Sequence, residues 1–175
     1  MLHFTSMKNK YLIFGNGYLG NKFKEYFKDS VISDIRIKSS DDVVEEIKKY
    51  NPDIVINCAG KVGKPNVEWC EDHKLETLDG NLVLLFYILK GCQETGKKLV
   101  HLSTGCIYQG DNNGKGFRED DEPNFDSSYY SKTKIIAENM LKDYDNVLII
   151  RIRLPADKEH SPRNLISKLL NSTKV

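Results

Sequence analysis

The 175-residue sequence lacks the features of several specialised protein classes. No apolar run approaches the roughly 20 residues that span a bilayer, and the start, MLHFTSMKNK, lacks the apolar core of a signal peptide. Neither charge is in excess, since 26 Lys and Arg balance 25 Asp and Glu, so no net field attracts nucleic acid or an acidic membrane. We therefore expect a cytoplasmic protein without nucleic-acid or membrane partners, and a flexible leader over residues 1–9.

The sequence also lacks the cysteine patterns of metal sites. None of its four cysteines forms a C-x-x-C pair, and no histidine cluster accompanies them. We expect no metal and reduced thiols in a reducing compartment. Three of the four are interpreted as small buried hydrophobic residues, and only the fourth is assigned chemistry below. The four are Cys58, Cys70, Cys92 and Cys106.

Hydrophobic residues make up 39% of the chain and charged residues 29%, which indicates one globular core. Apolar runs rich in β-branched residues alternate with segments of helical periodicity. The pattern predicts strands at 10–15, 30–37, 53–60, 98–105 and 146–154. It predicts helices at 18–29, 41–50, 67–95 (broken near His73 and closed by Gly96) and 128–144, and a last helix opened by Pro162. Continuous apolar strands alternating with helices are typical of a parallel sheet covered on both faces.

The segment FGNGYLG follows the first predicted strand and opens a helix, with Gly15, Gly17 and Gly20 in G-x-G-x-x-G spacing. This context indicates a dinucleotide-binding turn in a Rossmann-like, doubly wound α/β fold. Gly15 permits the turn, Gly17 lets a diphosphate approach the backbone, and Gly20 lets the helix pack on the strand. The plainer interpretation is a turn that serves packing alone. The candidate cofactor-binding residues here are Gly15, Asn16, Gly17, Tyr18, Leu19 and Gly20.

The end of the second predicted strand leaves the choice of NAD or NADP open. Asp34 could hold a ribose hydroxyl, whereas Arg36 and Lys38 could accept a 2′-phosphate. A solvated strand end explains all three residues equally well.

The helix YYSKTK places Tyr130 and Lys134 four residues apart, on one helical face. A neighbouring ammonium group favours the phenolate, so we expect Lys134 to lower the pKa of Tyr130 and make it a proton donor or acceptor. The spacing alone is common in ordinary amphipathic helices.

The order of the motifs is more specific than any one of them. A glycine turn, then STG at a strand end, then Y-x-x-x-K resembles the extended short-chain dehydrogenase/reductase family. The stretches NCAGKVGKPNVEWCEDHKLET, TGCIYQGDN, KGFREDDEPNF, SSYYSKTK and RIRLP narrow the resemblance to its sugar-nucleotide 3,5-epimerase/4-reductases and dTDP-4-dehydrorhamnose reductases. The likeness extends from about residue 10 to 175.

This resemblance implies roles for further residues. Thr104 is implied to complete a catalytic triad with Tyr130 and Lys134, and Cys106 and Lys168 to be the acid and base of epimerisation. NADPH or NADH is the implied cofactor and a dTDP- or UDP-linked 4-keto-6-deoxyhexose the implied substrate. Ala59 and Gly60 are implied to lie near the cofactor. The residues implied to contact the sugar are Asn66, Thr104, Cys106 and Tyr130. Trp69 is implied to lie beside the sugar pocket and Asn81 behind the active site.

The resemblance also implies a boundary. Residues 10–155 are expected to form the dinucleotide-binding domain and residues 156–175 the start of a truncated substrate-binding lobe. Three functions stay open: an epimerase/reductase, a dinucleotide-binding regulatory or interaction subunit, and a sugar-nucleotide 4-reductase without epimerisation, the last depending on the roles of Cys106 and Lys168. The polar loop 109–127 is expected to be a solvated connector or a cover for substrate. The oligomeric state is left open, a homodimer included.

Overall fold

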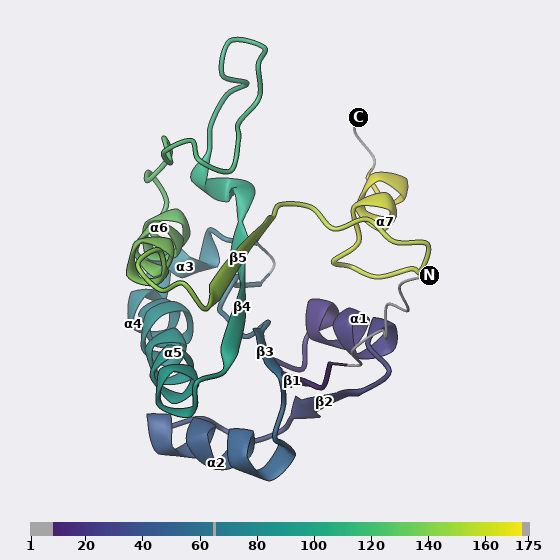
Figure 1. Cartoon of the computed structure of the whole chain (residues 1–175). Helices are drawn as coiled ribbons and strands as arrows, with labels where there is room; N and C mark the ends of the chain where they lie inside the picture. The colour runs from purple at the N-terminus through teal and green to yellow at the C-terminus, as the bar shows by residue number, and fades with distance from the viewer. Residues whose placement is uncertain (1–8, 65, 173–175) are drawn as a thin grey trace, which may run out of the picture.

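The computed structural model describes residues 9–64 and 66–172. Residues 1–8 of the expected leader lie outside this range. Five parallel strands form one sheet in the order β2-β1-β3-β4-β5, with helices on both sides (Figure 1), so the predicted α/β class is confirmed. The strands are β1 (Tyr11–Phe14), β2 (Ser30–Ser33), β3 (Ile54–Asn57), β4 (Lys98–Thr104) and β5 (Val147–Ile152).

The strand order reverses between β1 and β3. The chain leaves β1 towards β2 at one edge of the sheet and then crosses back to β3, which lies on the other side of β1. Ligands of open parallel sheets bind beyond the carboxyl ends of the strands at such a reversal. The topology therefore predicts a site just past Phe14 and Asn57, which are partners in the sheet register.

The helices α2, α5 and α6 pack on one face of the sheet, and α1 packs on the other face against β1 and β2 (Figure 1). Their bounds are α1 (Tyr18–Tyr26), α2 (Ser40–Tyr50), α3 (Trp69–Asp72), α4 (Lys74–Leu78), α5 (Leu84–Thr95), α6 (Tyr129–Leu141) and α7 (Leu165–Leu170). A π-helical turn, η1 (Asp79–Val83), joins α4 to α5, and a 3₁₀ turn, η2 (Gly105–Ile107), follows β4.

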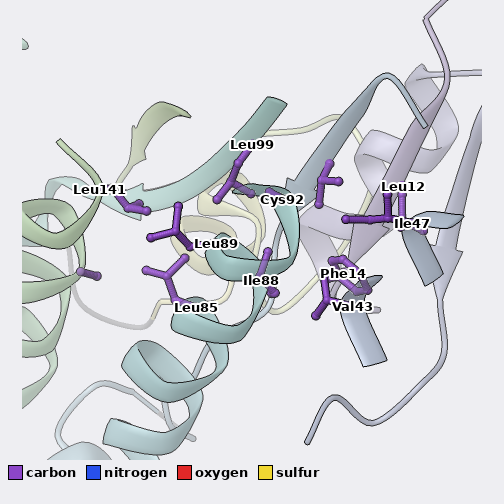
Figure 2. Close-up of a cluster of buried hydrophobic side chains, with 12 residues drawn as sticks. Leu12, Phe14, Val43, Ile47, Leu85, Ile88, Leu89, Cys92, Leu99 and Leu141 are labelled. Atoms are coloured by element: carbon purple, nitrogen blue, oxygen red, sulfur yellow. The ribbon is translucent and has the colours of Figure 1, made fainter. Parts of the chain in front are cut away.

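The main core lies between the sheet and helices α2, α5 and α6. Leu12 of β1 and Leu99 of β4 share one cluster with Val43 of α2 and Ile88 of α5, all of them wholly removed from solvent (Figure 2). Burying each such side chain contributes about 1.5–3 kcal/mol to the free energy of folding. Cys92 belongs to this core and Cys70 is buried elsewhere, as expected, whereas Cys58 is only half-buried.

Local signals set several helix ends. Ser39 and Asp42 form a capping box at the start of α2, and Asn51, in the left-handed conformation at φ 44°, ends it. Gly96 ends α5 with φ 64°, and the predicted break near His73 separates α3 from α4.

The bounds of two expected elements need correction. The second strand ends at Ser33 rather than residue 37, because Ile35 and Ile37 pack on the core from an irregular segment. Pro162 does not open the last helix, whose N-cap is the buried Asn164, with its side chain accepting from the amide of Ile166. The π-helical turn in 79–83 was not predicted.

The second face of the sheet is covered less completely than expected. On β5, Leu148 is 58% exposed and Ile150 is half-buried, since no described helix packs on this side of β4 and β5. The leucines of α7 are exposed as well, Leu169 by 56% and Leu170 by 72%. In the described part of the chain, no helix has the length and apolar character needed to cross a bilayer.

Candidate active site

The glycine turn between β1 and α1 lies at the predicted strand reversal. Gly15 has φ 107°, and a Cβ there would stand 2.5 Å from the amide nitrogen of Ala59. A Cβ on Gly20 would stand 1.9 Å from the carbonyl oxygen of Gly15, so the helix packs against the turn itself. A Cβ on Gly17 would meet nothing within 4 Å, and this residue, the N-cap of α1, faces an open cavity. The turn thus leaves room for an anion at the helix N-terminus.

Helix α6 presents three buried polar side chains at successive turns towards β4. Tyr130 and Lys134 are 5% and 4% exposed, and Nζ of Lys134 donates to the carbonyl oxygen of Leu102 at 3.3 Å. One turn later, Glu138 accepts from Ser103 and from Arg151, whose Nη2 lies 2.7 Å from its carboxylate. The ion pair fixes α6 on the sheet and so fixes where Tyr130 and Lys134 point.

The end of β4 brings the hydroxyl and the thiol of the TGC segment to the same place. Oγ1 of Thr104 accepts from the amide of Cys106 at 3.1 Å. The hydroxyl of Ser131 donates to the carbonyl oxygen of Cys106 at 2.8 Å. The first turn of α6 is therefore tied directly to the strand end.

These segments surround one cavity of about 440 Å³, here called the first cavity. Its lining from the predicted site comprises Gly17, Tyr18, Leu19, Ala59, Gly60, Asn66, Thr104, Cys106, Tyr130, Lys134 and Lys168. Its remaining lining is Cys58, Val62, Val67, Leu102, Ser103, Ile152, Arg153, Leu154, Pro155 and Arg163. The lining contains four cationic side chains and no carboxylate among the described residues.

The other predicted site residues lie outside this cavity. Gly15 and Gly20 shape the turn from behind, and Asn16 is exposed and accepts from the side-chain amide of Asn21. Asp34 and Arg36 are exposed beyond the end of β2 and do not line the cavity. No residue of loop 109–127 lines it either; the loop projects away from the body of the fold (Figure 1).

The expected lowering of the Tyr130 pKa is wrong for this structure. Burial raises the pKa of the Tyr130 phenol to about 12, and the opposing effects of the Thr104 hydrogen bond and of Arg163 are smaller. Burial also lowers the pKa of Lys134 to about 8. At neutral pH the phenol is therefore protonated, which makes it a hydrogen-bond and proton donor to a substrate oxygen.

Asn81 supports the site from behind. The π-helical turn presents its side chain to the loop after β3, where Oδ1 accepts from the amide of Lys61 at 2.8 Å. Its Nδ2 donates to the Lys61 carbonyl oxygen and to Oγ1 of Thr133, both at 3.1 Å. Asn81 thus links the loop carrying Gly60 to the helix carrying Lys134, which agrees with its implied place behind the active site.

Asn57 and His101 form a buried hydrogen-bonded pair beneath the loop after β3. Oδ1 of Asn57 accepts from the amide of Ala59 at 2.9 Å, and its Nδ2 donates to Nδ1 of His101 at 3.1 Å. Nε2 of His101 is the one buried side-chain polar atom without a hydrogen-bond partner among the described residues. Burial, and then the charge of Lys134, lower the pKa of His101 to about 3, so its ring is neutral.

Sequence reasoning missed two cavity residues, Arg153 and Arg163, which come from the irregular segment between β5 and α7. Lys22 of α1 lies 2.7 Å from Asp157 and also pairs with Glu159, and these ion pairs hold the segment against α1. Arg153 and Arg163, at the two ends of this segment, thereby reach the first cavity. The RIRLP stretch contains Arg153, but the resemblance implied no role for it, and only the folded path of the chain brings both arginines to the strand ends.

Comparisons with known proteins agree with this geometry. Residues 10–170 match the model of the NAD dependent epimerase/dehydratase family. The chain is 37% identical over 177 residues to a trifunctional UDP-glucose 4,6-dehydratase/UDP-4-keto-6-deoxy-D-glucose 3,5-epimerase/UDP-4-keto-L-rhamnose-reductase of Arabidopsis thaliana, covering 95% of this chain and 26% of that protein. It is 40% identical over 146 residues to the bifunctional dTDP-4-dehydrorhamnose 3,5-epimerase/dTDP-4-dehydrorhamnose reductase of the same plant, covering 80% and 48%.

A solved structure shows the same likeness in three dimensions. The UDP-rhamnose synthase of Acanthamoeba polyphaga mimivirus superposes with a TM-score of 0.84 at 32% identity, covering 94% of this chain and 62% of that one. The chain thus spans less than two thirds of each of these relatives. Sequence, topology and the site at the strand reversal all lead to one assignment: the chain belongs to the NAD dependent epimerase/dehydratase family.

Proposed function

We propose that the chain is an NAD(P)H-dependent nucleotide-sugar epimerase/reductase. Its reaction converts a dTDP- or UDP-linked 4-keto-6-deoxyhexose to the rhamnose nucleotide, by epimerisation at C3 and C5 and reduction of the C4 ketone. The observation that carries the proposal is the convergence of Thr104, Cys106, Tyr130 and Lys134 in one cavity with Gly17 of the glycine turn.

The residues present fit a nicotinamide dinucleotide. Gly17 leaves the cradle that a side chain would fill, and Ala59 and Gly60 border the same cavity. Such a turn would hold the diphosphate through backbone amides at the N-terminus of α1. When bound, the cofactor supplies the hydride for C4. Lys134, whose ammonium is buried beside the Leu102 carbonyl, would hold the nicotinamide ribose.

Tyr130 and Thr104 act on the C4 oxygen in this proposal. Because the Tyr130 pKa is raised, the phenol donates a hydrogen bond that stabilises the enolate during epimerisation and then gives its proton to the alkoxide during reduction. The Thr104 hydroxyl adds a second donor from the strand end.

Cys106 and Lys168 act on the ring carbons. A 4-ketone acidifies the protons on C3 and C5, and inversion needs one group to remove a proton and another to return it from the opposite face. Cys106 comes from the end of β4 and Lys168 from α7, and both line the first cavity. A thiol and an amine on separate elements suit this task.

A second candidate function rests on the exposure of α7. Lys168 is exposed and its neighbours Leu169 and Leu170 are unpacked, so the substrate side of the cavity is less enclosed than the cofactor side. A dinucleotide-binding regulatory or interaction subunit would need only the cofactor side. Within either function, residues 10–155 form the dinucleotide-binding domain and residues 156–175 the start of a substrate-binding lobe.

The test separates the two half-reactions in the purified chain. With the 4-keto-6-deoxyhexose nucleotide in deuterium oxide, NMR would follow label entering C3 and C5, and absorbance at 340 nm would follow NADPH and NADH oxidation. We expect Cys106→Ala to slow label uptake by about 10²–10⁴-fold and Tyr130→Phe to slow oxidation by a similar factor.

Cys58→Ala is the matched control, because Cys58 lines the same cavity and burial raises its thiol pKa to about 12. This variant should leave label uptake unchanged. Label uptake at the parent rate in Cys106→Ala would contradict the epimerase assignment. A chain that binds NADPH yet neither exchanges label nor oxidises cofactor would favour the regulatory subunit.

A further inference from the structure

The irregular segment after β5 and helix α7 form one unit, residues 155–170, here called the strap. Asn164, which is 1% exposed, ties the unit together. Its side chain accepts from the amide of Asp157 at 3.1 Å and donates to the carbonyl oxygen of Glu159 at 2.6 Å. The same side chain caps α7 by accepting from the amide of Ile166 at 3.0 Å. The irregular segment and α7 therefore keep a fixed arrangement within the strap.

The strap forms one wall of the first cavity. Arg163 and Lys168 line the cavity from the strap, whereas Cys106 and Tyr130 line it from the end of β4 and from α6. In the proposed function, Lys168 and Cys106 act on opposite faces of the sugar ring. The distance between the wall that carries Lys168 and the wall that carries Cys106 therefore depends on how the strap is held against the rest of the fold.

The ammonium group of Lys22 joins the strap to α1, beside which the strap lies (Figure 1). Nζ of Lys22 lies 2.7 Å from Asp157 and also pairs with Glu159, both on the strap. It lies 3.0 Å from Glu25 of α1 itself. The hydroxyl of Tyr18, one helical turn before Lys22, donates to Asp157 at 3.5 Å. Lys22 is thus the cation between the carboxylates of the strap and a carboxylate of the helix.

The charges at this contact are unequal, since three carboxylates converge on the Lys22 ammonium. The hydrogen bond between Lys22 and Asp157 is the main cause that raises the pKa of Lys22 and lowers the pKa of Asp157, so both groups are charged at neutral pH. Without the ammonium, the carboxylates of the strap would face Glu25 with like charge. Lys22 therefore makes attractive a contact that would otherwise be repulsive.

We propose that Lys22 is a positioning residue for epimerisation: it holds the strap at the first cavity and thereby places Lys168 opposite Cys106. This proposal rests on the proposed function. Lys22 does not line the cavity, so it acts through the strap and not on the substrate or the cofactor. The strap also reaches the loop after β3, where Nη2 of Arg163 donates to the carbonyl oxygen of Gly63 at 3.3 Å. This bond accepts no charge from the carboxylates and leaves their repulsion to Lys22.

Trypsin reports the position of the strap without substrate or cofactor. Arg163 is half-buried, so cleavage after it follows the population in which the strap has opened. Cleavage at this bond in the purified chain would be followed by mass spectrometry. We expect Lys22→Gln to be cleaved at least about fivefold faster than the parent, because it loses a small network of ion pairs. Lys22→Glu should be cleaved faster still, because it adds repulsion.

Charge can be separated from a general loss of stability. Lys28→Gln is the matched control, because Lys28 is an exposed cation just past the end of α1, and it should be cleaved like the parent. Lys22→Arg keeps the charge and should be cleaved like the parent as well. Raising the salt concentration from about 0.05 M to about 0.5 M, with rates taken relative to Lys28→Gln, should slow the cleavage of Lys22→Glu by screening its repulsion. Circular dichroism would establish that each variant is folded.

Label uptake at C3 and C5 tests the positioning role itself. Lys22→Glu should take up label at least about tenfold more slowly than the parent, because only the docked strap presents Lys168 to the cavity. Parent-like cleavage of folded Lys22→Gln and Lys22→Glu would refute the contact, whether or not the chain turns over. Label uptake at the parent rate in Lys22→Glu would refute the positioning role. A parent chain that gives the expected cleavage pattern yet takes up no label would count against the proposed function, and with it against the role of Lys168, and would leave Lys22 as the residue that holds the strap.

Discussion

Gly17 offers the sharpest test of the cofactor site, because its substitution should spare the fold. Gly17 has φ −105° and ψ −168°, which any residue adopts, and a Cβ there meets nothing within 4 Å. At the N-cap of α1, Asp and Asn are both favourable residues. Gly17→Asp and Gly17→Asn should therefore fold with a stability within about 1 kcal/mol of the parent.

The two variants differ in charge and hardly in shape. A carboxylate about 4 Å from a phosphate charge costs about 4 kcal/mol at an effective dielectric constant near 20. Screening by water and salt in an open cavity weakens this repulsion, and we take about 2 kcal/mol as its lower bound. Gly17→Asp should thus bind NADPH about 30- to 1000-fold more weakly than Gly17→Asn.

The assay uses energy transfer from Trp69, the single tryptophan, to bound NADPH, together with NADPH emission itself. Thermal unfolding monitored by circular dichroism would establish that all three proteins are folded. Equal NADPH affinity in the Asp and Asn variants would show that the diphosphate does not lie at this turn. The dinucleotide site would then have to be placed elsewhere.

Two further predictions concern the residues beneath the site. The folded-state pKa of His101 is lowered from 6.5 to about 3, so the folded chain binds fewer protons than the unfolded chain between these values, and stability falls as the pH drops through this window. Between pH 7 and pH 4 the free energy of unfolding should fall by about 3 kcal/mol less in His101→Asn than in the parent, as measured by urea titration at each pH. His160→Asn, at an exposed site, should show the same fall as the parent. Asn81→Ala leaves the Lys61 amide and carbonyl unpaired and should cost about 2 kcal/mol of folding free energy, with weaker NADPH binding; an unchanged urea midpoint would contradict its linking role.

Local patterns in the sequence were sufficient for the architecture. Alternation of apolar strands with helical segments is a local property, and so are the glycine turn before α1 and the spacing of Tyr130 and Lys134 on one helix. The strand reversal follows from parallel pairing, which brings the ends of β1, β3 and β4 to one edge. The candidate residues at these ends consequently meet in one cavity.

Two properties of the site, the pKa of Tyr130 and the position of Arg163, depend on burial and on contacts between distant residues, so only the tertiary structure determines them. The Tyr130 pKa is raised rather than lowered, because desolvation by the surrounding chain outweighs the lowering effects of Thr104 and of the Arg163 charge. Arg163 reaches the site only because the segment after β5 folds back over α1. Irregular segments such as this one follow no period, so their positions depend on long-range packing that a sequence pattern does not contain.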